Sequence, residues 1–143
     1  MHISGLIFIY FLSFSSGFSQ NDWELLSKVS FFEKEDPMSF DKIQVPDFSE
    51  ELKAMEGKRL ELTGYVIPLE SGSRPSFFVL SRFPYQSCFF CGAAGPETVV
   101  EVYAMLENPK ADERVTVTGQ LKLNANDPLH LFYQLEDAEV VDR

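Results

Sequence analysis

The chain contains two cysteines, Cys88 and Cys91, which stand three positions apart and are followed directly by Gly92. Two thiolates at this spacing can hold one soft cation such as Zn²⁺ or Cu⁺, and the glycine eases the tight turn that brings them together. A structural zinc site needs four ligands, and the sequence has no second cysteine pair. Further ligands would be a carboxylate or an imidazole, and the candidates are Glu97, Glu101 and His130. A symmetric dimer that shares two such loops would also supply four thiolates.

Two other interpretations of the cysteine pair stay open. Outside the cytoplasm a C-x-x-C pair can cycle between dithiol and disulfide, which would make the chain a periplasmic thiol–disulfide redox protein. Exchange catalysts place the first cysteine at the start of a helix, whereas aromatic residues and a Gly/Pro loop surround this pair. The third interpretation is a structural disulfide, or two buried thiols that shape the loop. A bridge across so short a loop removes little chain entropy and would stabilise the fold only slightly.

The segment 77–97, which carries the cysteines, is crowded with aromatic side chains. Aromatic residues dominate the cores of small domains, so most of them are expected inside, beginning with Phe77 and Phe78. Those that remain exposed would form a rim for a flat ligand or a partner protein. The candidates for this rim are Phe83, Tyr85, Phe89 and Phe90.

Catalysis is not predicted by any other pattern in the chain. His130 alternates with Leu129 and Leu131, so it should face away from the core. The serines near the cysteines lack the Gly-x-Ser-x-Gly context of a serine hydrolase, and no glycine-rich phosphate loop is present. An enzyme is therefore not the favoured class, although the thiol–disulfide alternative would be one.

Five segments with strand character follow Gly57, at 58–69, 76–81, 98–105, 113–123 and 129–140. Segments 59–64 and 114–119 share the pattern Arg-x-x-x-Thr-Gly, with apolar residues in alternation. A glycine in mid-strand marks a bulge or a sharp bend, which a small barrel requires. The pattern predicts a mainly β protein with a five-stranded OB-like barrel over 58–143, and a small sandwich is the alternative fold.

The N-terminal part divides in two. Residues 3–14 are almost continuously apolar but too few to span a bilayer, and small residues then precede a polar stretch at 20–22. This is the layout of a secretory signal peptide over 1–19, and a buried or anchoring N-terminal helix is the alternative. We therefore expect a periplasmic or secreted protein that has no membrane span after cleavage.

Residues 20–57 are expected to form an extension with one short helix. Ser49 should cap this helix at its start, and Gly57 should end it. Asp22 is expected to cap a short helical turn, residues 29–32 to form a strand, and residues 33–37 to turn. Residues 40–45 should be extended as far as Pro46, because the residue before a proline is pushed away from helix.

The charge of the chain lies entirely after Phe18, so the mature protein carries the whole formal charge of −10. An acidic domain repels the phosphate backbone of nucleic acids and the surface of anionic lipid. Nucleic acid is therefore not expected as a partner.

Several of these segments resemble a bacterial exported family, domain-of-unknown-function family 3299. Residues 56–70, EGKRLELTGYVIPLE, resemble its strand G-x-x-V-x-L-x-G-[FY]-x-x-P-L-E, and residues 77–80 before Cys88 resemble its apolar strand before a Cys-bearing loop. Residues 133–140 are similar to its closing Y-x-L-x-x-A-x-V, and Trp23 with Leu26 to its W-x-x-L opening. The family continues from its cysteine into Ile-His-Val and prolines, whereas this chain has a second cysteine nearby and no histidine there.

The resemblance implies an accessory envelope protein, because members are often encoded near ABC-transporter permeases and in some bacteria with zinc-uptake components. It supplies no established active site. Residues and resemblance together favour an exported, non-catalytic binding module that coordinates zinc or copper through Cys88 and Cys91 and assists an envelope transporter. The alternatives are the redox protein and a protein-interaction domain with a structural disulfide.

Overall fold

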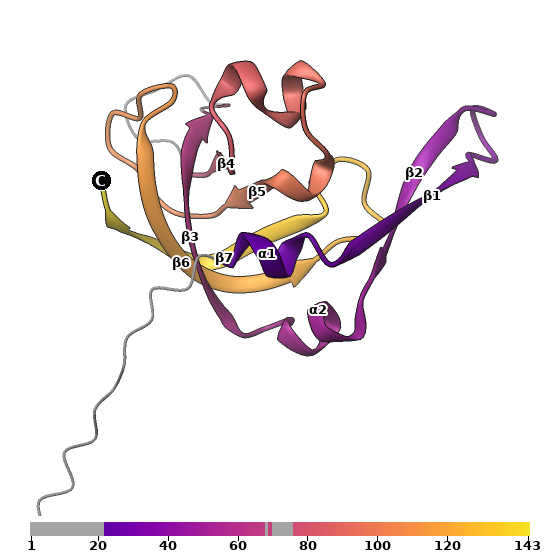
Figure 1. Cartoon of the computed structure of the whole chain (residues 1–143), viewed down its shortest axis with the longest axis horizontal. Coiled ribbons are helices and arrows are strands. Elements are labelled where there is room, and N and C mark those ends of the chain that lie inside the picture. The colour runs from indigo at the N-terminus through magenta and orange to yellow at the C-terminus, as the bar shows by residue number, and fades with distance from the viewer. Residues whose placement is uncertain (1–21, 68, 70–75) are drawn as a thin grey trace, which may run out of the picture.

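The structure is a computed structural model that describes residues 22–67, 69 and 76–143. Five strands close into a barrel in the order β3–β4–β5–β7–β6, and β6 returns to pair with β3 (Figure 1). Their bounds are β3 Arg59–Ile67, β4 Phe78–Ser81, β5 Val99–Val102, β6 Arg114–Leu123 and β7 Tyr133–Asp142. Neighbouring strands run antiparallel except β5 and β7, which pair in parallel. The predicted OB-like barrel is confirmed, and the alternative of a sandwich is wrong.

The alternation along β3 and β6 places their apolar residues inside the barrel. The fully or almost fully buried positions are Leu60, Leu62, Val66, Val115, Val117 and Leu121. The two mid-strand glycines allow close packing, because a Cβ at Gly64 would overlap the backbone oxygen of Ser81. At Gly119 it would lie 2.9 Å from the Cβ of Ala138. The register of β6 against β7 shifts around Gly119, which agrees with the irregularity expected there. At Gly64 the pairing of β3 with β6 continues without a shift, so no bulge interrupts that ladder.

Two short helices from the N-terminal extension close one end of this core. They are α1, Trp23–Leu26, and α2, Glu50–Met55. Trp23, Leu26 and Leu52 belong to the same apolar cluster as the barrel strands. Two hydrogen bonds fix α1 to the barrel. Trp23 Nε1 donates to the backbone oxygen of Thr63 at 2.8 Å, and Tyr133 Oη donates to the backbone oxygen of Leu26 at 2.7 Å. We call this pair of helices the plug.

The ends of the two helices agree only in part with the expected caps. Ser49 Oγ accepts from the Leu52 amide at 3.3 Å, and Gly57 follows α2 with a φ of +80°, as predicted. Asp22 does not cap α1 with its side chain. Its carboxylate accepts instead from the amide of Glu61 at 3.0 Å, because β3 runs beside the start of the helix.

The extension also forms an antiparallel hairpin, which Figure 1 shows projecting from the barrel. It comprises β1, Val29–Glu35, and β2, Lys42–Phe48. β1 runs further than expected, so the predicted turn at 33–37 is wrong over 33–35. The extended segment predicted over 40–45 begins only at Lys42, because Phe40 lies in the turn with a φ of +60°, and it continues to Phe48. Pro46 does not end its segment but lies inside β2, opposite Phe31. A proline is tolerated there because the outer side of a two-stranded sheet requires no further hydrogen bond from its nitrogen.

The bounds of several barrel strands differ from the predicted ones, since β4 begins at Phe78 rather than at residue 76 and β7 spans Tyr133–Asp142 rather than 129–140. Residues 129–132 do not belong to the last strand, since Asn124 Nδ2 donates to the oxygens of Asp127, His130 and Leu131 and holds a loop. The strand predicted over 98–105 is β5, which ends at Val102 rather than at residue 105. Thr98 belongs to a short 3₁₀ turn before this strand. The predicted signal peptide at 1–19 and the turn at 70–75 lie outside the described residues.

Candidate functional site

The loop between β4 and β5 carries both cysteines and is built from short 3₁₀ turns at Tyr85–Ser87, Phe89–Cys91 and Pro96–Thr98. The backbone oxygen of Cys88 accepts from the amides of Cys91 at 3.2 Å and Ala93 at 3.3 Å. Gly92 then adopts a φ of +76°, a left-handed conformation that glycine reaches without strain. This explains the Gly after the second cysteine and gives a compact turn around the first one. We call the turn over 88–93 the thiol knuckle.

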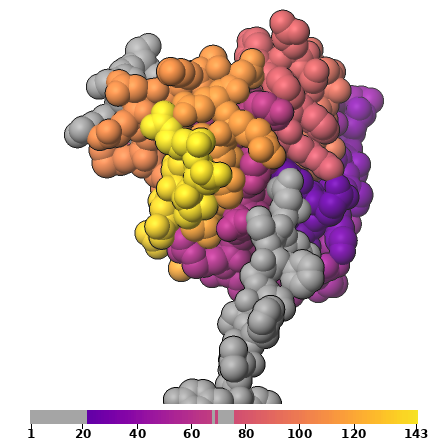
Figure 2. Space-filling model, turned by 60° about the vertical axis from the view of Figure 1, so that its left-hand side comes forward, coloured from indigo at the N-terminus to yellow at the C-terminus, as the bar shows by residue number. Residues whose placement is uncertain are grey.

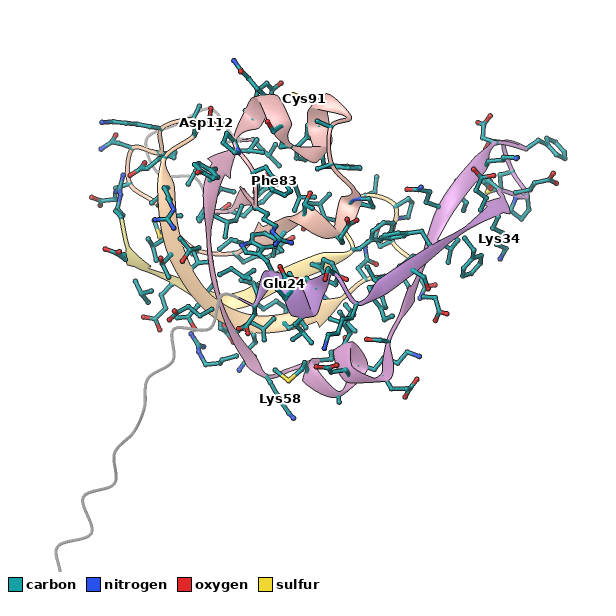
Figure 3. The ribbon with its side chains drawn as sticks, in the orientation of Figure 1. Glu24, Lys34, Lys58, Phe83, Cys91 and Asp112 are labelled. Carbon is teal, nitrogen blue, oxygen red and sulfur yellow. The ribbon has the colours of Figure 1, made fainter. Side chains whose placement is uncertain are left out.

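The two thiols of the knuckle have different surroundings, and both are free rather than joined in a disulfide. Cys88 is fully buried in a small second cluster with Ile67, Val79 and Val99. Cys91 is exposed, and its thiol donates to the backbone oxygen of Tyr85 at 2.8 Å. Figure 3 shows Cys91 at the same end of the barrel as Asp112.

The environment of Cys91 disfavours its thiolate. Local desolvation, the adjoining Cys88 thiol and then the charge of Asp112 raise the pKa of Cys91 above its ordinary value. A thiol–disulfide catalyst needs the opposite, a thiol whose pKa is lowered so that the nucleophilic thiolate is populated. The free knuckle is therefore poorly suited to attack a disulfide.

The aromatic residues around the knuckle are divided between surface and interior. Phe83, Tyr85 and Phe90 are exposed, and Phe89 is half-buried against the second cluster. Phe89 and Phe90 meet edge to face, with ring centroids 5.6 Å apart. In Figure 2 the segment around residue 90, in salmon, forms an outer edge of the molecule. The exposure required for an apolar rim is thus present.

The possible additional metal ligands are not gathered at the knuckle. Within the described part of the chain there is no group of three or more His, Cys, Asp or Glu residues that could hold a metal ion. Neither Glu97 nor His130 therefore completes a set with Cys88 and Cys91 in a single copy of the chain. Glu97 is half-buried directly after Pro96, at the far end of the loop.

His130 instead pairs with Glu101. Its Nδ1 lies 3.0 Å from Glu101 Oε2, and the same oxygen accepts from Tyr103 Oη at 2.8 Å. The other carboxylate oxygen accepts from the Leu131 amide at 2.9 Å. The side chain of Glu101 is only 7% exposed, whereas that of His130 is 43% exposed. Burial, and after it the hydrogen bond to Glu101 and the charge of that carboxylate, raise the pKa of Tyr103 to about 12. Its hydroxyl therefore stays protonated.

Sequence reasoning treated His130 as an isolated surface residue and missed this pairing. The signal that pointed to it is an acidic residue in the middle of β5, a strand whose four residues are all buried. A buried carboxylate must find hydrogen-bond donors inside the fold, because leaving it unpaired is costly.

A cavity of 480 Å³ opens beside His130, between the hairpin, the thiol-knuckle loop and the loop that joins β6 to β7. We call it the hairpin cavity. Its apolar lining comes chiefly from Ile43, Val45, Phe89, Pro96, Pro128 and Phe132. The polar groups that reach it include Asp36, Asp127 and His130. A mostly apolar pocket of this size with a few convergent polar groups is the usual form of a ligand site.

Comparison of the chain with models of known protein families and with curated proteins finds no match. The fold and the two features above therefore carry the functional argument. Among the described helices, none is long and apolar enough to cross a membrane.

Proposed function

We propose that the protein is an exported, non-catalytic binding module whose thiol knuckle takes up a soft metal ion, and that it assists an envelope transporter. The observation that carries this proposal is the preformed turn around Cys88. It holds two unbridged thiols side by side, so that binding requires little rearrangement of the backbone. The resemblance to domain-of-unknown-function family 3299 supports the accessory role.

The number of available ligands favours Cu⁺ over Zn²⁺. Zinc takes four ligands in structural sites, whereas the knuckle provides two thiols and the described residues add no third group. Soft thiolates select Cu⁺, which is stable with two of them. Zinc would require two copies of the chain to share their knuckles.

Thiol–disulfide exchange is the weaker alternative for the same residues. The sulfur of Cys88 is buried, and the raised pKa of Cys91 keeps that sulfur protonated. A bound cation would replace both protons, whereas an exchange reaction needs a thiolate that is already present before its partner arrives.

The test is an anaerobic titration of the purified, reduced protein with Cu⁺ in competition with a chromophoric chelator. We expect one ion per chain, loss of binding in both Cys88→Ser and Cys91→Ser, and unchanged binding in the neighbouring surface variant Ser87→Ala. Absence of chelator-resistant Cu⁺ would overturn the metal proposal. A parallel zinc titration with sedimentation analysis detects the shared-knuckle dimer, which would replace the copper assignment. Reversible disulfide cycling without metal uptake would favour the redox protein.

A second observation concerns the partner rather than the metal. The hairpin tip exposes Met38 at 92% and Phe40 at 82%, with Phe32 and Ile43 half exposed nearby. The tip lies beyond the contact of Phe31 with Phe132 that holds the base of the hairpin to the barrel, and exposed apolar patches of this kind mark interaction surfaces. Residues 33–42 contain four carboxylates and two lysines, so the partner surface that fits the tip is both apolar and basic.

A photo-crosslinking residue introduced at Phe40 tests this docking surface in cells. We expect one discrete adduct with a transporter component, formed less as the salt concentration rises. The matched control is the same replacement at Leu129, which is 87% exposed but lies outside the hairpin. Equal crosslinking from both positions, or an adduct of twice the protein's own mass, would contradict the proposed partner.

A further inference from the structure

The hairpin cavity has the geometry of a binding site that is separate from the thiol knuckle. Phe31 of β1 packs against Phe132 of the β6–β7 loop with ring centroids 5.4 Å apart, which ties the hairpin to the barrel at this point. Figure 1 shows that loop reaching toward the base of the hairpin. The cavity lies between elements that are far apart in the sequence but held in fixed relation by this contact.

The orientation of His130 leaves one ring nitrogen for a ligand. Its Nδ1 is engaged by the buried carboxylate of Glu101, and the Leu131 amide and Tyr103 hydroxyl hold that carboxylate in place. When Nδ1 carries the proton and donates it to Glu101, Nε2 is a hydrogen-bond acceptor. A second acceptor is close to it, since Asp127 Oδ2 lies 4.0 Å from His130 Nε2.

Two acceptors at this separation can both contact one donor atom. A nitrogen placed about 2.9 Å from each of them forms two hydrogen bonds of normal length. A primary ammonium group has the several N–H donors that this requires and also neutralises the carboxylate of Asp127. A hydroxyl has one donor and no charge, so it satisfies only one of the two acceptors.

The lining of the rest of the cavity indicates which kind of molecule can carry this ammonium group. Its walls are largely apolar, and two of them are the aromatic rings of Phe89 and Phe132. The described residues that line it include no lysine or arginine, whereas Asp36 and Asp127 both reach it. An anionic ligand would therefore meet repulsion without a compensating cation, and a cationic one meets attraction.

We infer that the hairpin cavity binds a small primary amine with an apolar body, the ammonium group lying between His130 Nε2 and Asp127 Oδ2. Glu101 is a positioning residue, because it acts by fixing the ring of His130. The polar groups of the amine site are not those of the proposed metal knuckle, and only Phe89 belongs to both, so either site can exist without the other.

The test compares three probes of nearly equal size with the purified protein, by NMR titration of its backbone amides. The probes are 2-phenylethylamine, the neutral 2-phenylethanol and the anionic 3-phenylpropionate. For an amine with so few atoms we expect a Kd on the order of 1 mM, about tenfold weaker binding of the alcohol and none of the acid. The amide shifts should gather around the cavity.

Asp127→Asn should weaken binding of 2-phenylethylamine about tenfold while leaving that of 2-phenylethanol nearly unchanged. Asp47→Asn on β2 is the control, since it removes the same charge from an exposed residue that does not line the cavity. Glu101→Gln should reduce amine binding and also change the ring-proton shifts of His130. No saturable binding of the amine, equal binding of the three probes, or equal losses in Asp127→Asn and Asp47→Asn would overturn the inference. The comparison of probes uses the wild-type protein, so it holds even if a variant fails to fold.

Discussion

The hydrogen bond from Tyr133 to the plug should make a measurable contribution to stability. Tyr133→Phe removes a hydroxyl that donates to the backbone oxygen of Leu26 at 2.7 Å in a fully buried environment. The oxygen of Leu26 then loses this partner inside the core, which costs about 1–3 kcal/mol. Unfolding of a small domain by urea has a slope of about 1–3 kcal/mol per molar, so the midpoint should fall by about 1 M.

Trp23 is the single tryptophan of the chain and lies in α1, so its fluorescence reports directly on the plug. Urea unfolding followed by this fluorescence and by circular dichroism should give one transition, at a lower midpoint in the variant. Tyr85→Phe is the matched control, because Tyr85 is 50% exposed and water can serve its hydroxyl. A midpoint that does not move, or that moves equally in Tyr85→Phe, would refute the role assigned to this bond.

Two further changes test the barrel and its last residue. Gly119→Ala should lower the free energy of unfolding, measured by urea, by about 1–3 kcal/mol. The reason is that the new Cβ would lie 2.9 Å from the Cβ of Ala138 and 3.0 Å from that of Leu135. A neutral effect would show that β6 and β7 separate easily. Arg143 lowers the pKa of Glu113 below its ordinary 4.5, so the pair stabilises the fold above about pH 4.5 and ceases to do so as the pH falls through the lower folded-state value. Glu113→Gln should therefore reduce the free energy of unfolding at neutral pH and have no effect in strong acid, and an equal loss at both would contradict this cause.

The barrel could be predicted because its signals are local. Alternating apolar residues in 58–69 and 113–123 identify two strands, and the glycines at 64 and 119 indicate where each must bend. The hairpin was predicted less well, since Pro46 is a strand breaker by local rules and is tolerated only because β2 has a free outer edge. That edge is a property of the whole fold and is not visible in a short window of sequence.

The motifs that resemble family 3299 have structural roles in this chain. Trp23 and Leu26 belong to the plug, and Tyr133 donates a hydrogen bond to the backbone oxygen of Leu26. Ala138 lies where a Cβ at residue 119 would crowd it, so it packs against the glycine. A resemblance carried by such packing residues indicates a fold and gives no information about a ligand. The barrel itself was predicted from the alternating residues and the two glycines, and these motifs left the site open.

The candidate site could be predicted only in part, because its residues meet across long distances in sequence. The spacing of Cys88 and Cys91 and the following glycine indicate a tight turn from sequence alone, and the thiol knuckle has that turn. The pairing of Glu101 with His130 depends on where the β6–β7 loop folds over β5. Asn124 fixes that loop through backbone oxygens, which no residue pattern specifies.

The knuckle and the hairpin cavity adjoin each other through the second apolar cluster. Cys88 packs in that cluster, with Phe89 and Leu131 against it. Phe89 also lines the cavity, and the amide of Leu131 holds the carboxylate that orients His130. A cation held by the two sulfurs would therefore lie beside Phe89, which forms one wall of the cavity, and even a small adjustment there would reach that wall. If both ligands bind, thermodynamic linkage requires that each alter the affinity of the other by the same factor. A cluster of so few side chains has little capacity to absorb a shift without passing it on, because protein interiors are closely packed.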